Sequence, residues 1–267
     1  MAKFAFWKAG NRHRQYKNLL RTALKLDMDT TKIMGFLRDI AAHNNREWFL
    51  ENRKRYDQAR EEFENGVEEL LHGIMKFDPS IANLTVKDCT YRFYRDVRFS
   101  SDKAPYKRHF GAYINAKGRK ALRGGYYMHL QPGNCFVAVG SYWLPNNILT
   151  ACRNEIMANI DTWRKAVENG KFVKLFGYAG GNGMGEYTDG DTMPPKGFGT
   201  THLKKAPKDF PKDYEFMDYL RMKDYCCWHS VPDDFFKDAD WVDKTTEIFR
   251  TGKPMMDFMN AVIDDYE

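Results

Sequence analysis

The chain has 267 residues, of which 43% are hydrophobic and 15% aromatic, so it can bury a substantial core and is not a disordered protein. Its net charge of +6 is unevenly distributed, because residues 1–27 and 87–123 are basic whereas residues 209–267 carry fifteen acidic and seven basic residues. No run approaches the ~18 apolar residues that cross a bilayer, which excludes a transmembrane protein and gives no reason to expect a membrane partner.

Residues 1–30 are predicted to form a basic, loosely ordered extension ahead of the folded domain. Apolar residues then recur at helical spacing and predict a helix from about Thr31, with Asp29 as a candidate N-cap. Asn45 offers the N-cap of a second helix that continues to about Phe77. Gly66 marks a position where that helix can break.

Residues 91–99 alternate between apolar and polar or cationic side chains, which predicts a β-strand with a cationic face. Three further strands are predicted at 109–116, 124–132 and 134–144, and a tight Pro-Gly-Asn turn joins the last two as a hairpin. These connections are too short for crossover helices, so the sheet is expected to be antiparallel.

Helical spacing returns after Pro145, and a shorter helix from Asp161 ends at Gly170. Residues 177–200 contain eight glycines and are predicted to form a long loop, without the spacing of a phosphate-binding loop. The remaining residues predict a helix, a short strand and two helices. The expected fold is therefore one α+β domain over residues 31–267, with a central antiparallel β-sheet flanked by helices.

The segment 94–107, YRDVRFSSDKAPYK, concentrates charged side chains and is the main candidate for a functional site. On the predicted strand Arg92 and Arg98 lie on one face, a geometry suited to bidentate recognition of phosphate or carboxylate. The Ser-Ser-Asp-Lys turn adds hydroxyls and backbone N–H groups that can bind an anion. The substrate-binding candidates are Arg46, Arg92, Arg95, Arg98, Ser100, Asp102, Lys103, Tyr106 and Lys107.

The same segment also fits a network of internal ion pairs, in which Asp96 binds Arg95 or Arg98 and Asp102 caps the turn. Over residues 87–123, however, eleven basic residues face three acidic ones. Complete internal pairing is therefore not expected unless the acidic C-terminal region folds over the segment.

Asp96 and His129 are the candidates for proton transfer. His129 shares a face of its predicted strand with Tyr127, and His109 begins the preceding strand, so both histidines can face a pocket. A histidine on a half-buried strand is more often a hydrogen-bonded structural residue, and this alternative stays open.

The cysteines do not predict a metal site. All five lack the paired spacing of a disulfide framework, which predicts free thiols and a cytoplasmic location. Cys226, Cys227 and His229 form an isolated cluster with no second ligand pair nearby. No metal and no cofactor is therefore predicted.

Four blocks carry a resemblance to a known family: FLRDIAAHNNREWFLENRKRY, YRDVRFSSDKAPYKRHFGAYI, GGYYMHLQPGNCFVAVGSYWLP and LKKAPKDFPKDYEFMDYLRMKDY. In order and spacing they resemble the conserved hypothetical proteins of domain of unknown function 2461, over about residues 31–264. The resemblance implies a single bacterial-type cytosolic domain and implies no activity. The positions that match the main motif are Arg95, Asp96, Arg98, Phe99, Ser100, Asp102, Lys103, Pro105, Tyr106 and Lys107. The N-terminal block matches at residues 45–49.

These observations favour a protein that binds, and in one version acts on, a small molecule bearing phosphate or carboxylate. Two alternatives remain. The basic segments and surface tyrosines also fit a nucleic-acid-binding module, against which the acidic C-terminal region weighs. A scaffold domain with internally matched charges is the other alternative. The sequence leaves open whether the protein is an enzyme and what its oligomeric state is.

Overall fold

The computed structural model describes residues 28–180, 196–199 and 201–266. Of the predicted extension 1–30, all but the last three residues lie outside this part. Met28 is buried in the core and Thr30 begins the first described helix, so the last three residues of the predicted extension belong to the folded domain. No helix in the described ranges is long and apolar enough to span a bilayer.

From Met28 onward, the described chain begins with three helices: α2 (Thr30–Ala42), α3 (Arg46–Glu51) and α4 (Arg53–Met75). The predicted caps are confirmed, because Asp29 accepts a hydrogen bond from the N–H of Thr31 at 3.0 Å and Asn45 accepts one from the N–H of Trp48 at 2.9 Å. The break in the second predicted helix lies at Asn52, between α3 and α4.

Gly66 does not break the helix that contains it. It is buried inside α4, where a β-carbon would collide with the side chain of Met28. A glycine in the middle of a helix usually costs stability, and here it allows the chain that precedes α2 to pack closely.

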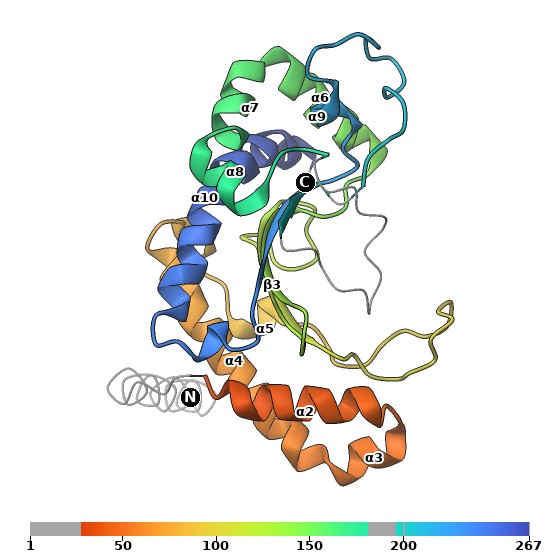
Figure 1. Cartoon of the computed structure of the whole chain (residues 1–267), viewed down its shortest axis with the longest axis vertical. Helices are drawn as coiled ribbons and strands as arrows, with labels where there is room; N and C mark the ends of the chain where they lie inside the picture. The colour runs from red at the N-terminus through yellow and green to blue at the C-terminus, as the bar shows by residue number, and fades with distance from the viewer. Residues whose placement is uncertain (1–27, 181–195, 200, 267) are drawn as a thin grey trace, which may run out of the picture.

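The predicted strand at 91–99 is wrong. This segment has no regular secondary structure and forms one side of an irregular arm, residues 94–106, that projects from the domain as the yellow loop in Figure 1. A single bridge between Tyr94 and Tyr106 closes the arm at its base, where the N–H of Arg95 donates to the carbonyl of Pro105 at 2.9 Å. Alternation alone did not make a strand, because the arm has no neighbouring strand over its length.

Within the residues that the structure describes, the sheet has five antiparallel strands in the order β1-β2-β3-β5-β4. The strands are β1 (Phe110–Ile114), β2 (Gly125–Leu130), β3 (Cys135–Ser141), β4 (Lys196–Phe198) and β5 (Tyr225–Val231). The three strands predicted between residues 109 and 144 and the hairpin that joins the last two are confirmed. β4 lies within the predicted loop 177–200, where it adds an edge strand beside β5.

Among the remaining described helices, α5 (Val86–Cys89) precedes β1. Helices α6 (Asn146–Ala158), α7 (Ile160–Val167) and α8 (Gly170–Phe176) lie between β3 and β4, α9 (Met217–Arg221) lies between β4 and β5, and α10 (Trp241–Ile263) follows β5. Short 3-10 turns lie at Pro79–Ile81, Phe235–Lys237 and Asp264–Tyr266. The two C-terminal helices expected from sequence are one helix, because α10 continues through Pro254.

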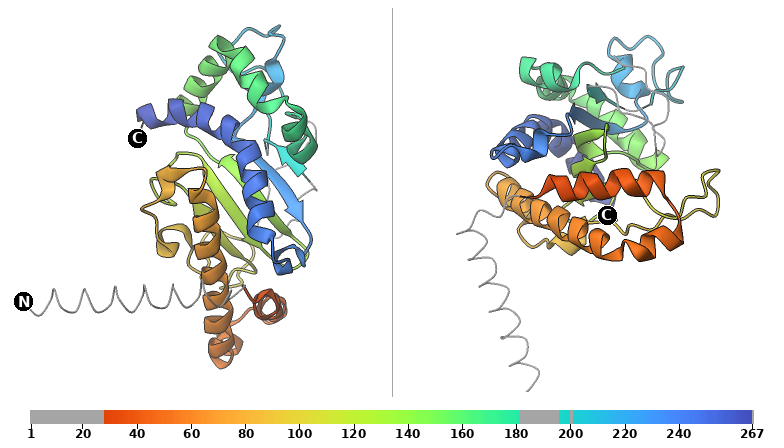
Figure 2. Two further views of the ribbon diagram at one scale, coloured as in Figure 1. Left: turned by 90° about the vertical axis from the view of Figure 1, so that its left-hand side faces the viewer. Right: turned by 60° about the horizontal axis from the view of Figure 1, so that its bottom comes forward.

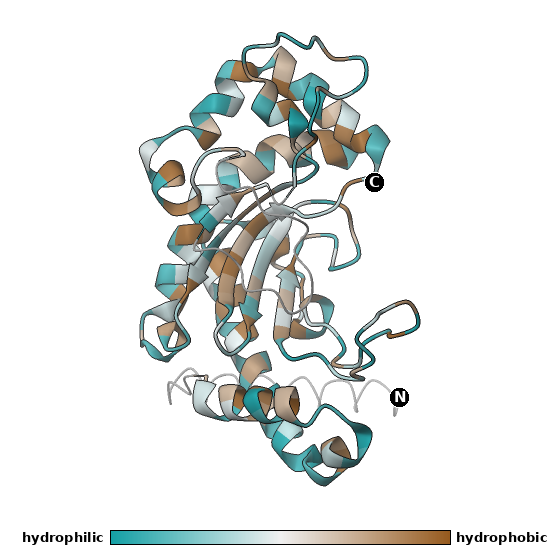
Figure 3. Cartoon of the chain, turned by 45° about the vertical axis from the view of Figure 1, so that its right-hand side comes forward, coloured by the Kyte–Doolittle hydropathy of each residue, from teal (hydrophilic) through white to brown (hydrophobic). Residues whose placement is uncertain are grey.

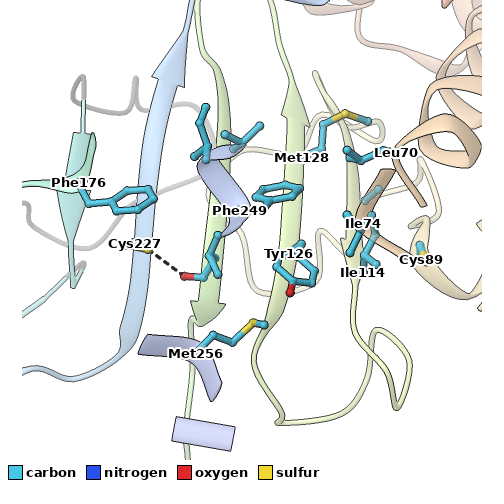
Figure 4. Packing of buried hydrophobic residues seen from close by; sticks show 14 of the residues in the cluster. Leu70, Ile74, Cys89, Ile114, Tyr126, Met128, Phe176, Cys227, Phe249 and Met256 are labelled. Carbon is cyan, nitrogen blue, oxygen red and sulfur yellow. Dashed lines mark hydrogen bonds between the residues drawn. The ribbon is translucent and has the colours of Figure 1, made fainter. Parts of the chain in front are cut away.

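Helices α4 and α10 cover one face of the sheet, as the left view of Figure 2 makes clear, and α6 to α9 lie beyond one end of it (Figure 1). The core lies between these helices and the sheet. Figure 4 shows Tyr126 and Met128 of β2 beside Phe249 of α10 and Leu70 of α4, all fully buried. The prediction of one α+β domain with a central antiparallel sheet is confirmed.

The opposite face of the sheet carries a second, separate hydrophobic cluster of Phe136, Ala138, Cys226 and Trp228, with Tyr127 packed against it. Apolar residues therefore lie on both faces of the central strands. Figure 3 shows the hydrophobic residues of these strands in brown. The two adjacent cysteines of β5 point to opposite faces of the sheet: Cys227 belongs to the main core and Cys226 to the second cluster.

Candidate functional site

The charged motif of the arm forms a compact set of ion pairs around Asp102. Its Oδ2 atom lies 2.7 Å from Nη1 of Arg95 and 2.8 Å from Nη1 of Arg108. Its Oδ1 atom accepts the backbone N–H of Ala104 at 2.9 Å. Arg95 also donates to the carbonyl of Ala104 and to the hydroxyl of Ser100. These contacts cross-link the two sides of the arm.

This environment favours the ionised form of Asp102. The hydrogen bond from the N–H of Ala104 and the two arginine contacts hold the pKa of the carboxyl well below its usual range. Because Arg95 has only 11% of its side chain exposed, its guanidinium is positioned by the fold. Asp102 therefore acts as the anion that Arg95 and Arg108 bind.

Arg98 is bound in the same way by Asp96, through Nε at 3.0 Å and Nη2 at 2.7 Å. This bidentate contact lowers the pKa of Asp96. The carboxylate is consequently ionised and occupied by an arginine, an arrangement that does not suit proton transfer at neutral pH. Arg92 and Arg98 do not share a strand face, since no strand forms here.

The acidic C-terminal region reaches this basic part of the chain at Asp264, which pairs with Arg123 and Lys117.

The arm is fixed to the domain at its base. Asn44 holds the backbone of Tyr106 with two hydrogen bonds, of 2.9 Å and 3.0 Å. The buried ring of Tyr106 stacks on Phe49, with 4.1 Å between centroids. Tyr106 is therefore part of the core, and Arg46, in the first turn of α3, is an exposed neighbour of this base.

The tip of the arm is exposed. Phe99 has 97% of its surface accessible, and the guanidinium of Arg98 lies 5.8 Å from its ring centroid. Lys103 donates to the carbonyl of Val97, which closes the tip. Most of the predicted anion-binding residues thus lie together on the arm, engaged mainly with one another.

A cavity of about 560 Å³ lies on the sheet face opposite to α4 and α10. Small residues of the central strands, Gly125, Ala138 and Gly140, form its floor. Trp228 forms a wall, and its indole lies directly over Gly197 of the edge strand, where any β-carbon would overlap the ring. The aromatic residues that line the cavity are Tyr91, Tyr113, Tyr127, Phe136, Tyr142, Trp143 and Trp228.

Three basic residues, Lys107, Arg119 and Lys120, also line the cavity, and among the described residues around it none is acidic. Lys107 lies 5.0 Å above the ring of Tyr91, and Arg119 donates to the backbone carbonyls of Lys87 and Asp88. Lys107 is the predicted binding residue that the structure brings to this cavity. An apolar cavity with a few polar groups is the usual form of a small-molecule site.

His129 reaches the cavity through Tyr127. Its Nδ1 atom lies 2.9 Å from the hydroxyl of Tyr127, and its Nε2 atom lies 3.0 Å from Oε1 of Gln131. The side chain is 1% exposed and stacks on Phe136, with 4.5 Å between centroids. Both ring nitrogens are hydrogen-bonded to neighbouring side chains. This is the geometry of a structural histidine, the alternative to a role in proton transfer.

Arg119, Lys120, Trp143 and Trp228 were not among the residues predicted from sequence. The signal that could have indicated this side of the sheet is the pair of small residues at alternate positions of β3, Ala138 and Gly140, with Gly125 opposite Gly140 on β2. Within the described ranges, no group of three or more His, Cys, Asp or Glu side chains is arranged to hold a metal ion. The cysteines are buried and free, and burial raises the pKa of the Cys152 thiol to about 12.

The arm, the sheet and the cavity all lie within one region of sequence similarity. Residues 32–258 match the family described as Conserved hypothetical protein (DUF2461). The chain belongs to this family. The DUF2461 region extends from α2 into α10, and the resemblance carried by the four sequence blocks is confirmed. No curated protein and no solved structure matches the chain.

Proposed function

We propose that this protein binds a small anionic molecule, bearing phosphate or carboxylate, in the cavity on the open face of the sheet. The observation that carries the proposal is the set of three basic residues, Lys107, Arg119 and Lys120, on a cavity with no acidic residue among its described lining. A cation near an apolar surface binds an anion more strongly than one in bulk water, because the local dielectric constant is lower.

The residues proposed to bind the anion therefore line the cavity and are not the arginines of the arm. The arginines of the arm are engaged by Asp96 and Asp102, so an anion would have to compete with a covalently tethered carboxylate. Lys107 follows the arm directly and belongs to the cavity lining. The buried free cysteines further support a reducing location such as the cytoplasm.

Ligand binding is tested by fluorescence titration and thermal shift with organic phosphates and carboxylates, and with neutral alcohols of the same shape. Trp143 and Trp228 line the cavity and serve as reporters. We expect the anions, and not the neutral alcohols, to raise Tm. Lys107→Met or Lys120→Met should weaken anion binding about tenfold or more, which is the effect of losing one hydrogen bond to a charged group. Lys54→Met, at an exposed position of α4, is the matched control. Binding that is equal for alcohols and anions would overturn the proposal.

Nucleic-acid binding is the second candidate, favoured by the exposed Phe99 beside Arg98 at the tip of the arm. Aromatic side chains flanked by arginine stack on unpaired bases. This candidate predicts retardation of a single-stranded oligonucleotide at low salt that Phe99→Ala removes. Absence of retardation by the intact protein would exclude it and leave the ion-paired arm as a scaffold element.

A further inference from the structure

The basic residues of the cavity lie at one end, and an apolar cluster lies at the other. The three basic residues all come from segments that flank β1: Lys107 precedes the strand, and Arg119 and Lys120 follow it. Two of the cavity's buried apolar residues, Trp228 and Cys226, come from β5. The sheet order β1-β2-β3-β5 separates these strands by three steps, about 14 Å at the usual spacing of neighbouring strands.

The end at β5 is suited to a flat aromatic group. Trp228 forms the back of this end, because it is 1% exposed and one side of its indole lies against Gly197. The half-buried Tyr127 offers ring surface that a ligand can reach. Phe136, Ala138 and Cys226 complete this end as one hydrophobic cluster, with Tyr127 beside it. Aromatic rings prefer offset-stacked or edge-on contacts with other rings, which a saturated ring cannot make.

We propose that the ligand of this cavity is an aromatic compound with a single terminal anionic group, bound with the anion at the β1 end and the ring near Trp228. This inference rests on the proposed function and specifies its ligand class. The anionic group is a carboxylate or a phosphate monoester. Either one places a terminal negative charge beside Lys107, Arg119 and Lys120.

The test compares matched ligands in calorimetric titrations of the full chain. One series is phenyl phosphate, cyclohexyl phosphate and inorganic phosphate, and the other is 3-phenylpropanoate, 3-cyclohexylpropanoate and propanoate. We expect the aromatic member of at least one series to bind at least tenfold more tightly than its saturated analogue. The series that binds identifies the anionic group. Equal or tighter binding of the saturated compound would overturn this inference.

Orientation is tested with 4-nitrophenyl phosphate, whose nitrophenyl ring quenches nearby tryptophan fluorescence. The measurement is made in a Trp143→Phe background, which removes the other tryptophan of the cavity lining. There we expect strong quenching by the bound compound, most of which is lost when Trp228→Phe is added, although this variant still binds the compound. Ala138→Leu narrows the β5 end and is expected to abolish binding of the ring. Circular dichroism and Tm show whether each variant is folded, and quenching that persists in folded Trp228→Phe would overturn the proposed orientation.

The titrations distinguish an error in the ligand class from an error in the proposed anion binding itself. If an anion binds and Lys107→Met weakens it, but saturated and aromatic compounds bind alike, the proposed function stands and the ligand class is wrong. If none of the phosphates and carboxylates binds to the folded protein, both are wrong. Lys54→Met, on the exposed side of α4, is the control for non-specific loss of positive charge.

Discussion

Arg95 and Asp102 face each other across the arm, with 2.7 Å between Nη1 of the guanidinium and Oδ2 of the carboxylate. The same carboxylate binds Arg108 and the N–H of Ala104. Asp102 is thus the point at which the two sides of the arm and the segment that leads into β1 are connected. The arm owes its defined shape to this local network, since its length contains one bridge and no regular strand.

Replacing Asp102 by Asn is expected to loosen the arm without unfolding the domain. The amide keeps the shape of the side chain but removes the charge that binds Arg95 and Arg108. Limited trypsin digestion should then cleave after the exposed Arg98 several-fold faster, while Tm changes little. Asp213→Asn, on an exposed segment, is the control. An unchanged cleavage rate would mean that the ion pairs do not hold the arm.

The arm should also respond to acid through Asp102. The pKa of this carboxyl is lowered in the folded protein, so its contribution is fully present above the ordinary aspartate value of about 3.9 and is lost as the pH falls through the folded value. The NMR signal of the Ala104 amide, which donates to Asp102, reports this change. We expect its position to stay constant down to about pH 4 and to move only below it. The same titration in Asp102→Asn should show no such movement.

Tyr126→Phe is expected to destabilise the core. The hydroxyl of Tyr126 donates to Oδ2 of buried Asp78 at 2.8 Å. Burial raises the pKa of Asp78, but hydrogen bonds from Ser80 and Tyr126 outweigh it and lower the pKa overall. Loss of a hydrogen bond to a charged group costs about 1.5–3 kcal/mol, measurable by urea denaturation at pH 7.

The pH dependence of this loss has a defined sign. Tyr126 helps to lower the pKa of Asp78, so its stabilising effect is present at neutral pH and decreases as Asp78 becomes protonated below about pH 4. The difference in unfolding free energy between wild type and Tyr126→Phe should therefore shrink at pH 3. Tyr178→Phe, which alters an exposed ring, should be neutral at both pH values. A difference that grows in acid would contradict the assignment.

Gly197→Ala is expected to disturb the wall of the cavity. A β-carbon at this position overlaps the indole of Trp228, so either the ring or the edge strand β4 must move. Overpacking of this kind costs about 1–3 kcal/mol, and displacement of a buried tryptophan should shift its fluorescence to longer wavelength. Gly170→Ala is the matched control, because no atom lies within 4 Å of its added carbon. It should leave stability unchanged or raise it by up to about 1 kcal/mol.

Much of the fold followed from local patterns in the sequence. The helix caps at Asp29 and Asn45 were predictable because a short polar side chain before an apolar helical pattern satisfies the free N–H groups of the first turn. The hairpin at residues 124–144 was predictable because its turn residues and alternation agree. The predicted α+β class followed from these elements.

The arm was mispredicted because apolar alternation does not require a strand. Phe93 is buried, yet Phe99 at the tip is almost completely exposed, although both have the same parity along the chain. Pairing partners decide whether such a segment becomes a strand, and partners are set by the tertiary fold. The charge count of residues 87–123 likewise could not show that Arg95 and Arg98 are engaged within the arm itself.

The sequence by itself determined the family, the α+β class, the helix caps and the surplus of positive charge in the middle of the chain, because each depends on residues close together along the chain. The tertiary structure decided where that charge lies and what it can contact. Lys107, Arg119 and Trp228 meet around one cavity because strand pairing brings β1 and β5 into one sheet. That arrangement depends on contacts between distant segments, which local pattern does not encode.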